Sequence, residues 1–194
     1  MKKLSRMISL LLAGVMVLVA LTACSGGVVG GKVYGTFKSG SADTPDVNGL
    51  KIQSCSVRKS EIPDDCGKYV GKEIVYVTYG VVNESSQPLD MEHAMGELFS
   101  NGYGEELYNN LFSKGSKYFT VGVNGSKSTD VFAYGLKMYS DEYADSILAS
   151  GKFTAVQVMI LVPKGWKNVT VQWKPSCGQG KSVAFRFTPN DIED

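Results

Sequence analysis

The side chains that most often carry catalysis are sparse in this sequence. His93 is the only histidine among 194 residues, so a metal site with two His ligands cannot form within the chain, and a Ser-His-Asp triad would depend on His93 itself. Asp90 and His93 are three residues apart and would share one face of a helix. An exposed histidine in a loop or at a helix end explains this segment more simply than acid–base or metal chemistry. We therefore predict no catalytic residue, no metal site and no cofactor.

Cys24 is the residue whose surroundings point most clearly to a chemical modification. Residues 1–23 have three basic residues near their start (Lys2, Lys3 and Arg6), contain no acidic residue and continue as an apolar run, which is the pattern of a secretory signal peptide. The run from residue 8 to residue 23 is shorter than the roughly 20 apolar residues that a retained membrane helix needs. Leu21-Thr22-Ala23-Cys24 resembles the lipobox of bacterial lipoproteins: an aliphatic residue, two small residues and a cysteine.

The lipobox resemblance implies that residues 1–23 are removed and that the Cys24 thiol receives a lipid through a thioether. Two or more acyl chains hold a protein stably on a bilayer, as the two chains of a diacylglyceryl group or an added palmitate would. We therefore expect a chain that is lipid-anchored at the cell membrane and faces outside the cytoplasm.

Three cysteines remain once Cys24 is assigned to lipid, namely Cys55, Cys66 and Cys177. Thiols outside the cytoplasm tend to be oxidised, and an odd number allows at most one internal bridge. A bridge from Cys55 to Cys66 would close a loop of 12 residues, which the chain-entropy model values at about 3 kcal/mol. A bridge from Cys66 to Cys177 is the alternative, and three buried free thiols are a third reading. No two of these cysteines have the spacing of a zinc site.

The charge of the chain argues against nucleic acid as a partner. Removing residues 1–23 leaves 17 basic and 19 acidic residues, a net charge of −2. The sequence has no basic cluster or stripe of the kind that displaces phosphate counterions. The partners we expect are the membrane, through the lipid on Cys24, and a protein or glycan of the cell envelope. The sequence leaves the oligomeric state open.

The segment that follows Cys24 is rich in Gly, Ser, Asp and Pro, and we predict that residues 24–48 form a disordered, flexible tether. A random coil of that length spans roughly 27 Å. The stretch from Lys32 to Phe37 has strand-forming residues, but Gly35 in its middle weakens a strand. The predicted organisation is a signal peptide over 1–23, the tether over 24–48 and one folded domain over 49–194.

Strand periodicity dominates the predicted domain. Residues 73–82 form a run of β-branched and aromatic residues that ends at a turn. Apolar and polar residues alternate in further predicted strands, namely 131–136, 156–162, 169–174 and 183–188. Residues 50–57 and 118–121 are weaker strand candidates.

Two segments carry other local signals. Asn101-Gly102 favours a type I′ hairpin between residues 97–100 and 103–107, whereas i,i+4 pairs of Leu and aromatic residues favour a helix over 104–113; we prefer the hairpin. Residues 141–149 are predicted as one short helix, because Ser140 can cap its start and Gly151 follows its end.

Seven or eight short strands and one short helix define an all-β fold, an antiparallel β-sandwich, with an α+β sheet as the alternative. Three segments resemble the Ig-like sandwich domain of unknown function carried by many Gram-positive lipoproteins: EIVYVTYGVVNESSQPL, FSNGYGEELYNN and VGVNGSKSTDVFAYGL. That resemblance implies an extracytoplasmic location and binding of a protein or ligand. It implies no reaction, because a fold does not determine a function.

Three functions are compatible with these features. A non-enzymatic binding or interaction module of the cell envelope fits the anchor, the sandwich and the missing catalytic set best. An accessory subunit of a transporter or envelope complex would need a large apolar patch on one sheet face. A hydrolase of envelope polymers would need two carboxylates facing one cleft.

Overall fold

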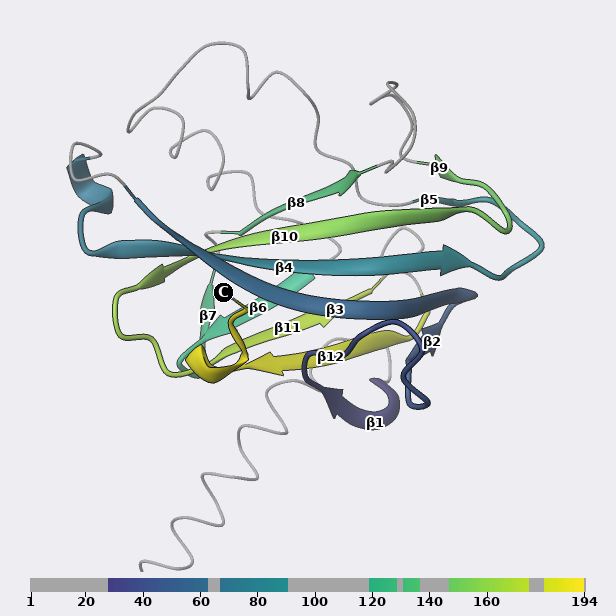
Figure 1. Ribbon diagram of the computed structural model, residues 1–194, viewed down its shortest axis with the longest axis horizontal. Helices are drawn as coiled ribbons and strands as arrows, with labels where there is room; N and C mark the ends of the chain where they lie inside the picture. The colour runs from purple at the N-terminus through teal and green to yellow at the C-terminus, as the bar shows by residue number, and fades with distance from the viewer. Residues whose placement is uncertain are drawn as a thin grey trace, which may run out of the picture.

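A computed structural model describes residues 28–62, 67–90, 119–128, 131–136, 147–174 and 180–193. The described residues are almost entirely β structure, with two short 3-10 turns, η1 (Gly67–Tyr69) and η3 (Pro189–Asp191). Figure 1 shows that the long strands lie in two layers that face each other, so the domain is a β-sandwich. The strands are β1 (Val28–Tyr34), β2 (Asp46–Val47), β3 (Leu50–Glu61), β4 (Lys72–Asn83), β5 (Leu89–Asp90), β6 (Phe119–Val123), β7 (Ser126–Ser128), β8 (Val131–Leu136), β9 (Ile147–Leu148), β10 (Phe153–Pro163), β11 (Val169–Trp173) and β12 (Ser182–Phe187).

The two layers are five-stranded sheets. One has the order β1-β12-β11-β6-β7 and the other has the order β2-β3-β4-β10-β8, while β5 and β9 form a separate two-stranded sheet. All pairings are antiparallel except that of β1 with β12, which is parallel. The expected antiparallel sandwich is therefore correct for every described strand pair but this one.

The core lies between the sheets and follows from the alternation of side chains along each strand. In β11 and β12 every second residue faces inward, and Trp173, Phe185 and Phe187 are fully buried. The Tyr79 ring of β4 lies 5.1 Å from Trp173 and 4.7 Å from Phe185 between centroids, which joins the two sheets through aromatic contacts.

The chain enters the sandwich at one end, which we call the proximal end. Val28 of β1 lies opposite Ser182 of β12 there, and the Asn48 side chain bonds to the backbone of Lys181. The distal end is the opposite one, where β4 begins at Lys72 and β10 ends at Pro163. In Figure 1 the proximal end is on the right and the distal end is on the left.

The expected tether is wrong for residues 28–47, which belong to the folded domain. β1 adds a strand to the edge of β12, and its register shifts between Val28 and Val33, where Gly31 has a φ of +65°. Phe37 exchanges two backbone hydrogen bonds with Cys55 of β3, and Val47 of β2 is fully buried. Strand pairing and burial outweigh the loose composition of this segment, which was the sole basis for expecting disorder.

The predicted helix over 141–149 is also wrong in its described part. Ile147 and Leu148 form β9 and pair with Asp90 and Leu89 of β5, because a strand partner is available there and Leu148 becomes buried. Residues 141–146 lie outside the described residues, as does the predicted hairpin or helix over 97–113.

Two Asn-Gly turns and one buried asparagine fix the connections. Asn48-Gly49 and Asn124-Gly125 both have positive φ at each residue, the type I′ geometry that suits tight hairpins. The fully buried Asn83 at the end of β4 donates hydrogen bonds to the carbonyls of Gln87 and Leu148 and accepts from Ser85. Asn83 thereby joins β4 to the β5–β9 pair.

Candidate functional site

A hollow opens at the distal end because β8 pairs with β10 only as far as Ile160 and Val131. The next residues of β10, up to Pro163, have no described strand on that side. The β6–β7 hairpin lies there instead, closed by the turn at Asn124-Gly125. The resulting hollow has a volume of about 240 Å³ and is lined by Lys72, Val123, Ser126, Lys127, Ser128, Leu161 and Pro163.

The lining combines two cations with hydroxyls and apolar walls. Neither Lys72 nor Lys127 forms an ion pair within the described part of the chain. The ammonium of Lys72 lies 5.5 Å from the centre of the buried Tyr69 ring, and that of Lys68 lies 5.2 Å from the same ring. These cation–π contacts hold the two lysines at the rim while leaving their N–H groups available.

Two further lysines stand beside the hollow. The backbone N–H of Lys164, the residue after Pro163, donates to the Gly71 carbonyl at 2.9 Å. The backbone N–H of Lys167 donates to Asn124 Oδ1 at 2.7 Å. Like Lys68, both side chains are exposed and have no ion pair among the described residues. Among the described residues, the surroundings of the hollow therefore carry an excess of positive charge.

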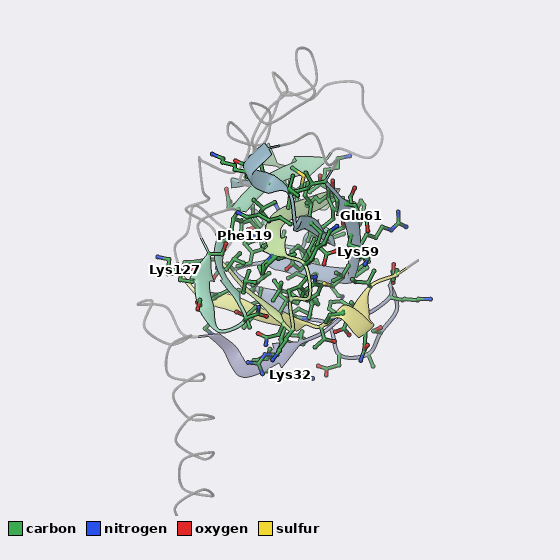
Figure 2. All side chains as sticks on the ribbon, turned by 90° about the vertical axis from the view of Figure 1, so that its left-hand side faces the viewer. Lys32, Lys59, Glu61, Phe119 and Lys127 are labelled. Carbon is green, nitrogen blue, oxygen red and sulfur yellow. The ribbon has the colours of Figure 1, made fainter. Side chains whose placement is uncertain are left out.

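The described carboxylates at the distal ends of β3 and β4 lie away from the hollow. Glu61 and Glu73 are directly opposite each other on β3 and β4, and Lys59 Nζ is 3.7 Å from Glu73 Oε2. Figure 2 views this end and shows Lys127 on one side, with Lys59 and Glu61 on the other. No carboxylate is among the described lining residues. The two carboxylates facing one cleft that a hydrolase would need are therefore not a feature of this hollow.

The site residues named from the sequence are only partly described. Cys24, Cys66, Cys177 and His93 lie outside the described residues. Cys55 is described, and its thiol is free and fully buried on the inner face of β3. The predicted Cys55–Cys66 bridge is therefore absent from the structure, and the alternative Cys66–Cys177 bridge stays a prediction.

The position of Cys55 in mid-strand explains why its bridge is absent. Six residues of extended strand separate Cys55 from Glu61 at the distal end of β3, a length of about 20 Å. A disulfide needs Cα atoms within about 7 Å of each other. The extended strand therefore places Cys55 well beyond this limit from the distal end of β3, although only six residues separate the two in the sequence.

Cys55 and Tyr79 form a buried pair of weak acids at the centre of the sandwich. They are directly opposite each other in the β3–β4 register. Burial raises the pKa of the Cys55 thiol well above its usual value, and the nearby carboxylates of Glu193 and Asp191 raise it further. Burial likewise raises the pKa of Tyr79, and the charge of a Cys55 thiolate would add to this effect. The Tyr79 hydroxyl is buried and has no hydrogen-bond partner among the residues that the structure describes. Both groups are therefore inert at neutral pH.

This buried pair predicts an alkaline limit on stability. The unfolded chain releases these protons near the reference pKa values of 9.0 and 10.0, whereas the folded chain keeps them. The folded state then binds more protons, so stability is complete below about pH 9 and falls as the pH rises further. We expect the double variant Cys55→Ala/Tyr79→Phe to lose less stability than the wild type between about pH 8 and about pH 11. Urea unfolding at each pH measures this, with Tyr34→Phe as the control; equal losses in the two proteins would contradict it.

The sequence reasoning missed the lysine-lined hollow. Lys72 and Lys127 are far apart in the sequence, and each reads as an ordinary surface lysine. The available signal was the repeated placement of lysines beside turn glycines, with Lys72 after Gly71, Lys127 two residues after Gly125, and Lys164 before Gly165. Only the pairing of β10 with β4 and the position of the β6–β7 hairpin bring these residues together.

Two further properties complete the description of the site and its surroundings. Within the described ranges, no three His, Cys, Asp or Glu side chains are grouped as metal ligands would be. None of the helical turns in those ranges has the length and apolar character needed to cross a membrane.

The strands and their two-sheet arrangement define the class of protein as a β-sandwich. The sequence matches no protein-family model and no curated protein. Among solved structures, the chain is similar to a crystal structure described as an uncharacterized beta-sandwich protein from Clostridium difficile 630. The two share 9% identity at a TM-score of 0.38, over 81% of this chain and 95% of that one. The fold assignment rests on the strands of this chain itself.

Proposed function

We propose that this chain is a bacterial lipoprotein whose Cys24 carries a lipid anchor and whose β-sandwich is a non-catalytic binding module outside the cytoplasm. The observation that carries the binding role is the hollow between Lys72 and Lys127, whose described lining offers donors and positive charge but no nucleophile paired with a base. Such a lining can hold a ligand, whereas acid–base or covalent catalysis needs groups that it lacks.

We also propose that the sandwich is Ig-like, which its strand order supports. Ig domains have one sheet with the order A-B-E-D and another that contains G, F and C, extended by C′ in variable-type domains. The order β3-β4-β10-β8 corresponds to A-B-E-D, and β12-β11-β6-β7 corresponds to G-F-C-C′. The chain visits these strands in alphabetical order, as an Ig domain does. β1 is an additional strand beside the last one.

The accessory-subunit alternative has less support from the described surface. That role would use a broad apolar patch on one sheet face. The large apolar side chains exposed in the described ranges are Val33, Val70 and Phe153, and they belong to three separate segments. Val70 is at the distal end and Phe153 at the proximal end, so they do not combine into one patch.

The anchor is tested by replacing the acceptor thiol. We expect Cys24→Ser to abolish lipid attachment, so that the protein either leaves the membrane fraction or accumulates as the uncut precursor, because serine cannot form the thioether. Membrane fractionation and intact-mass measurement distinguish these forms from the wild type. Cys177→Ser is the matched control and should remain anchored. A Cys24→Ser protein that is processed and still membrane-bound would overturn the proposal.

A further inference from the structure

We infer that the distal hollow binds a phosphate group of a soluble ligand, and that it does so facing away from the membrane. The second part rests on the proposed anchor at Cys24, and the first part does not. The inference begins with charge: Lys72 and Lys127 line the hollow and form no ion pair with any residue that the structure describes, and Lys68, Lys164 and Lys167 surround it. A cluster of unneutralised cations in a concave site concentrates anions.

The kind of anion follows from the donors and from the charge that they match. The two positive charges of the ammonium groups about balance the charge of one phosphate group at neutral pH, which is −1.5 to −2. Ammonium N–H groups and the Ser126 hydroxyl are donors that match acceptor oxygens. No described lining residue is a carboxylate, which would repel the ligand. Leu161, Pro163 and Val123 form apolar walls that exclude water from one side and strengthen charge-assisted hydrogen bonds.

The size of the hollow limits how much of the ligand it can enclose. A volume of about 240 Å³ is several times the roughly 30 Å³ that one water occupies in the liquid. The hollow therefore accommodates a phosphate and the atoms next to it. The three lysines at the rim extend the positive surface beyond the hollow, so a ligand with further phosphates would follow that rim.

The position of the hollow argues for a soluble ligand over the headgroup of a neighbouring lipid. β1 begins at Val28, four residues after Cys24, so the connection spans at most about 14 Å when fully extended. Val28 is at the proximal end, and the 11 residues of β10 separate that end from the hollow by about 35 Å. An anchor held at the proximal end places the hollow on the far side of the domain from the bilayer.

The test is a calorimetric titration in which inorganic phosphate is added, at constant ionic strength, to the purified full chain in neutral detergent. We expect saturable binding that weakens about tenfold or more in Lys72→Gln/Lys127→Gln, because the variant loses two charge-assisted hydrogen bonds to the phosphate. The matched control is Lys152→Gln/Lys181→Gln, which removes the same charge from exposed residues near the proximal end. It should bind within about twofold of the wild type. Unchanged urea unfolding midpoints show that both variants are folded.

Any of three results would overturn the inference. The first is the absence of saturable binding at millimolar phosphate. The second is equal weakening in the two double variants, which would mean that net charge and not the hollow attracts the anion. The third is lysine-dependent binding of the Cys24→Ser protein to phosphatidylglycerol vesicles but not to phosphatidylcholine vesicles, which would make the ligand a lipid headgroup. The phosphate titration does not need the anchor, so a failure of the proposed lipidation would leave it intact and remove only the orientation.

Discussion

Trp173→Ala is expected to remove about 3–5 kcal/mol from the free energy of unfolding, the range for deleting a large aromatic side chain from a packed core. Trp173 is fully buried and contacts both sheets. Its ring is stacked on Phe119 at 5.3 Å and lies 5.1 Å from Tyr79, between centroids. The substitution would also remove the aromatic contact with Tyr79 that joins β4 to β11. Such a loss is a large share of the roughly 5–15 kcal/mol that a small domain possesses.

Urea unfolding followed by the fluorescence of the remaining Trp166 measures this loss. Phe153→Ala is the control, because Phe153 is also aromatic but is 39% exposed at the start of β10, and we expect it to cost less than about 1.5 kcal/mol. A loss below about 1 kcal/mol for Trp173→Ala would be incompatible with its place at the centre of the core.

Removing residues 28–48 is also expected to be strongly destabilising, although the sequence alone predicts that they belong to a flexible tether. A chain that starts at Gly49 loses the buried Val47, worth about 1.5–3 kcal/mol. It also loses the hydrogen bonds of β3 with Phe37 and Pro45, worth about 0.5–1.5 kcal/mol each. The ordering entropy of the segment offsets part of this, and we expect a net loss of about 3 kcal/mol or more.

The truncated chain should also associate. Without β1 and β2, the edges of β12 and β3 present unpaired backbone groups that can pair with another chain. Size-exclusion chromatography and urea unfolding of chains that start at Val28 and at Gly49 provide the comparison. Equal stability and equal elution behaviour in the two chains would show that residues 28–48 are a tether after all.

The strands of the core were predictable because their pattern is a direct consequence of geometry. Alternating apolar residues in β11 and β12 face the core, as expected for strands with one buried face. The run of β-branched and aromatic residues over 73–82 in β4 also has a physical reason: Ile74 on the outer face is buried as well as Val75 and Val77 on the inner face. Such a run is typical of a strand buried on both faces.

The parts that could not be predicted depend on contacts between distant segments. β1 has two adjacent glycines and little alternation, and it is a strand because β12 offers it an edge. Ile147 and Leu148 have a helical context in the sequence but pair with β5. The hollow belongs to the same category, since nothing in the surroundings of Lys72 indicates that Lys127 is its neighbour.

The parallel pairing of β1 with β12 has a mechanical consequence. The first and last strands of the domain are neighbours that run in the same direction, so the amino-terminal side of the chain leaves at the proximal end and the carboxyl-terminal side continues towards the distal end. A pulling force applied to the start of β1 and the end of β12 would act along these strands, at right angles to the hydrogen bonds between them. Those bonds would share the load in shear and would not open one after another.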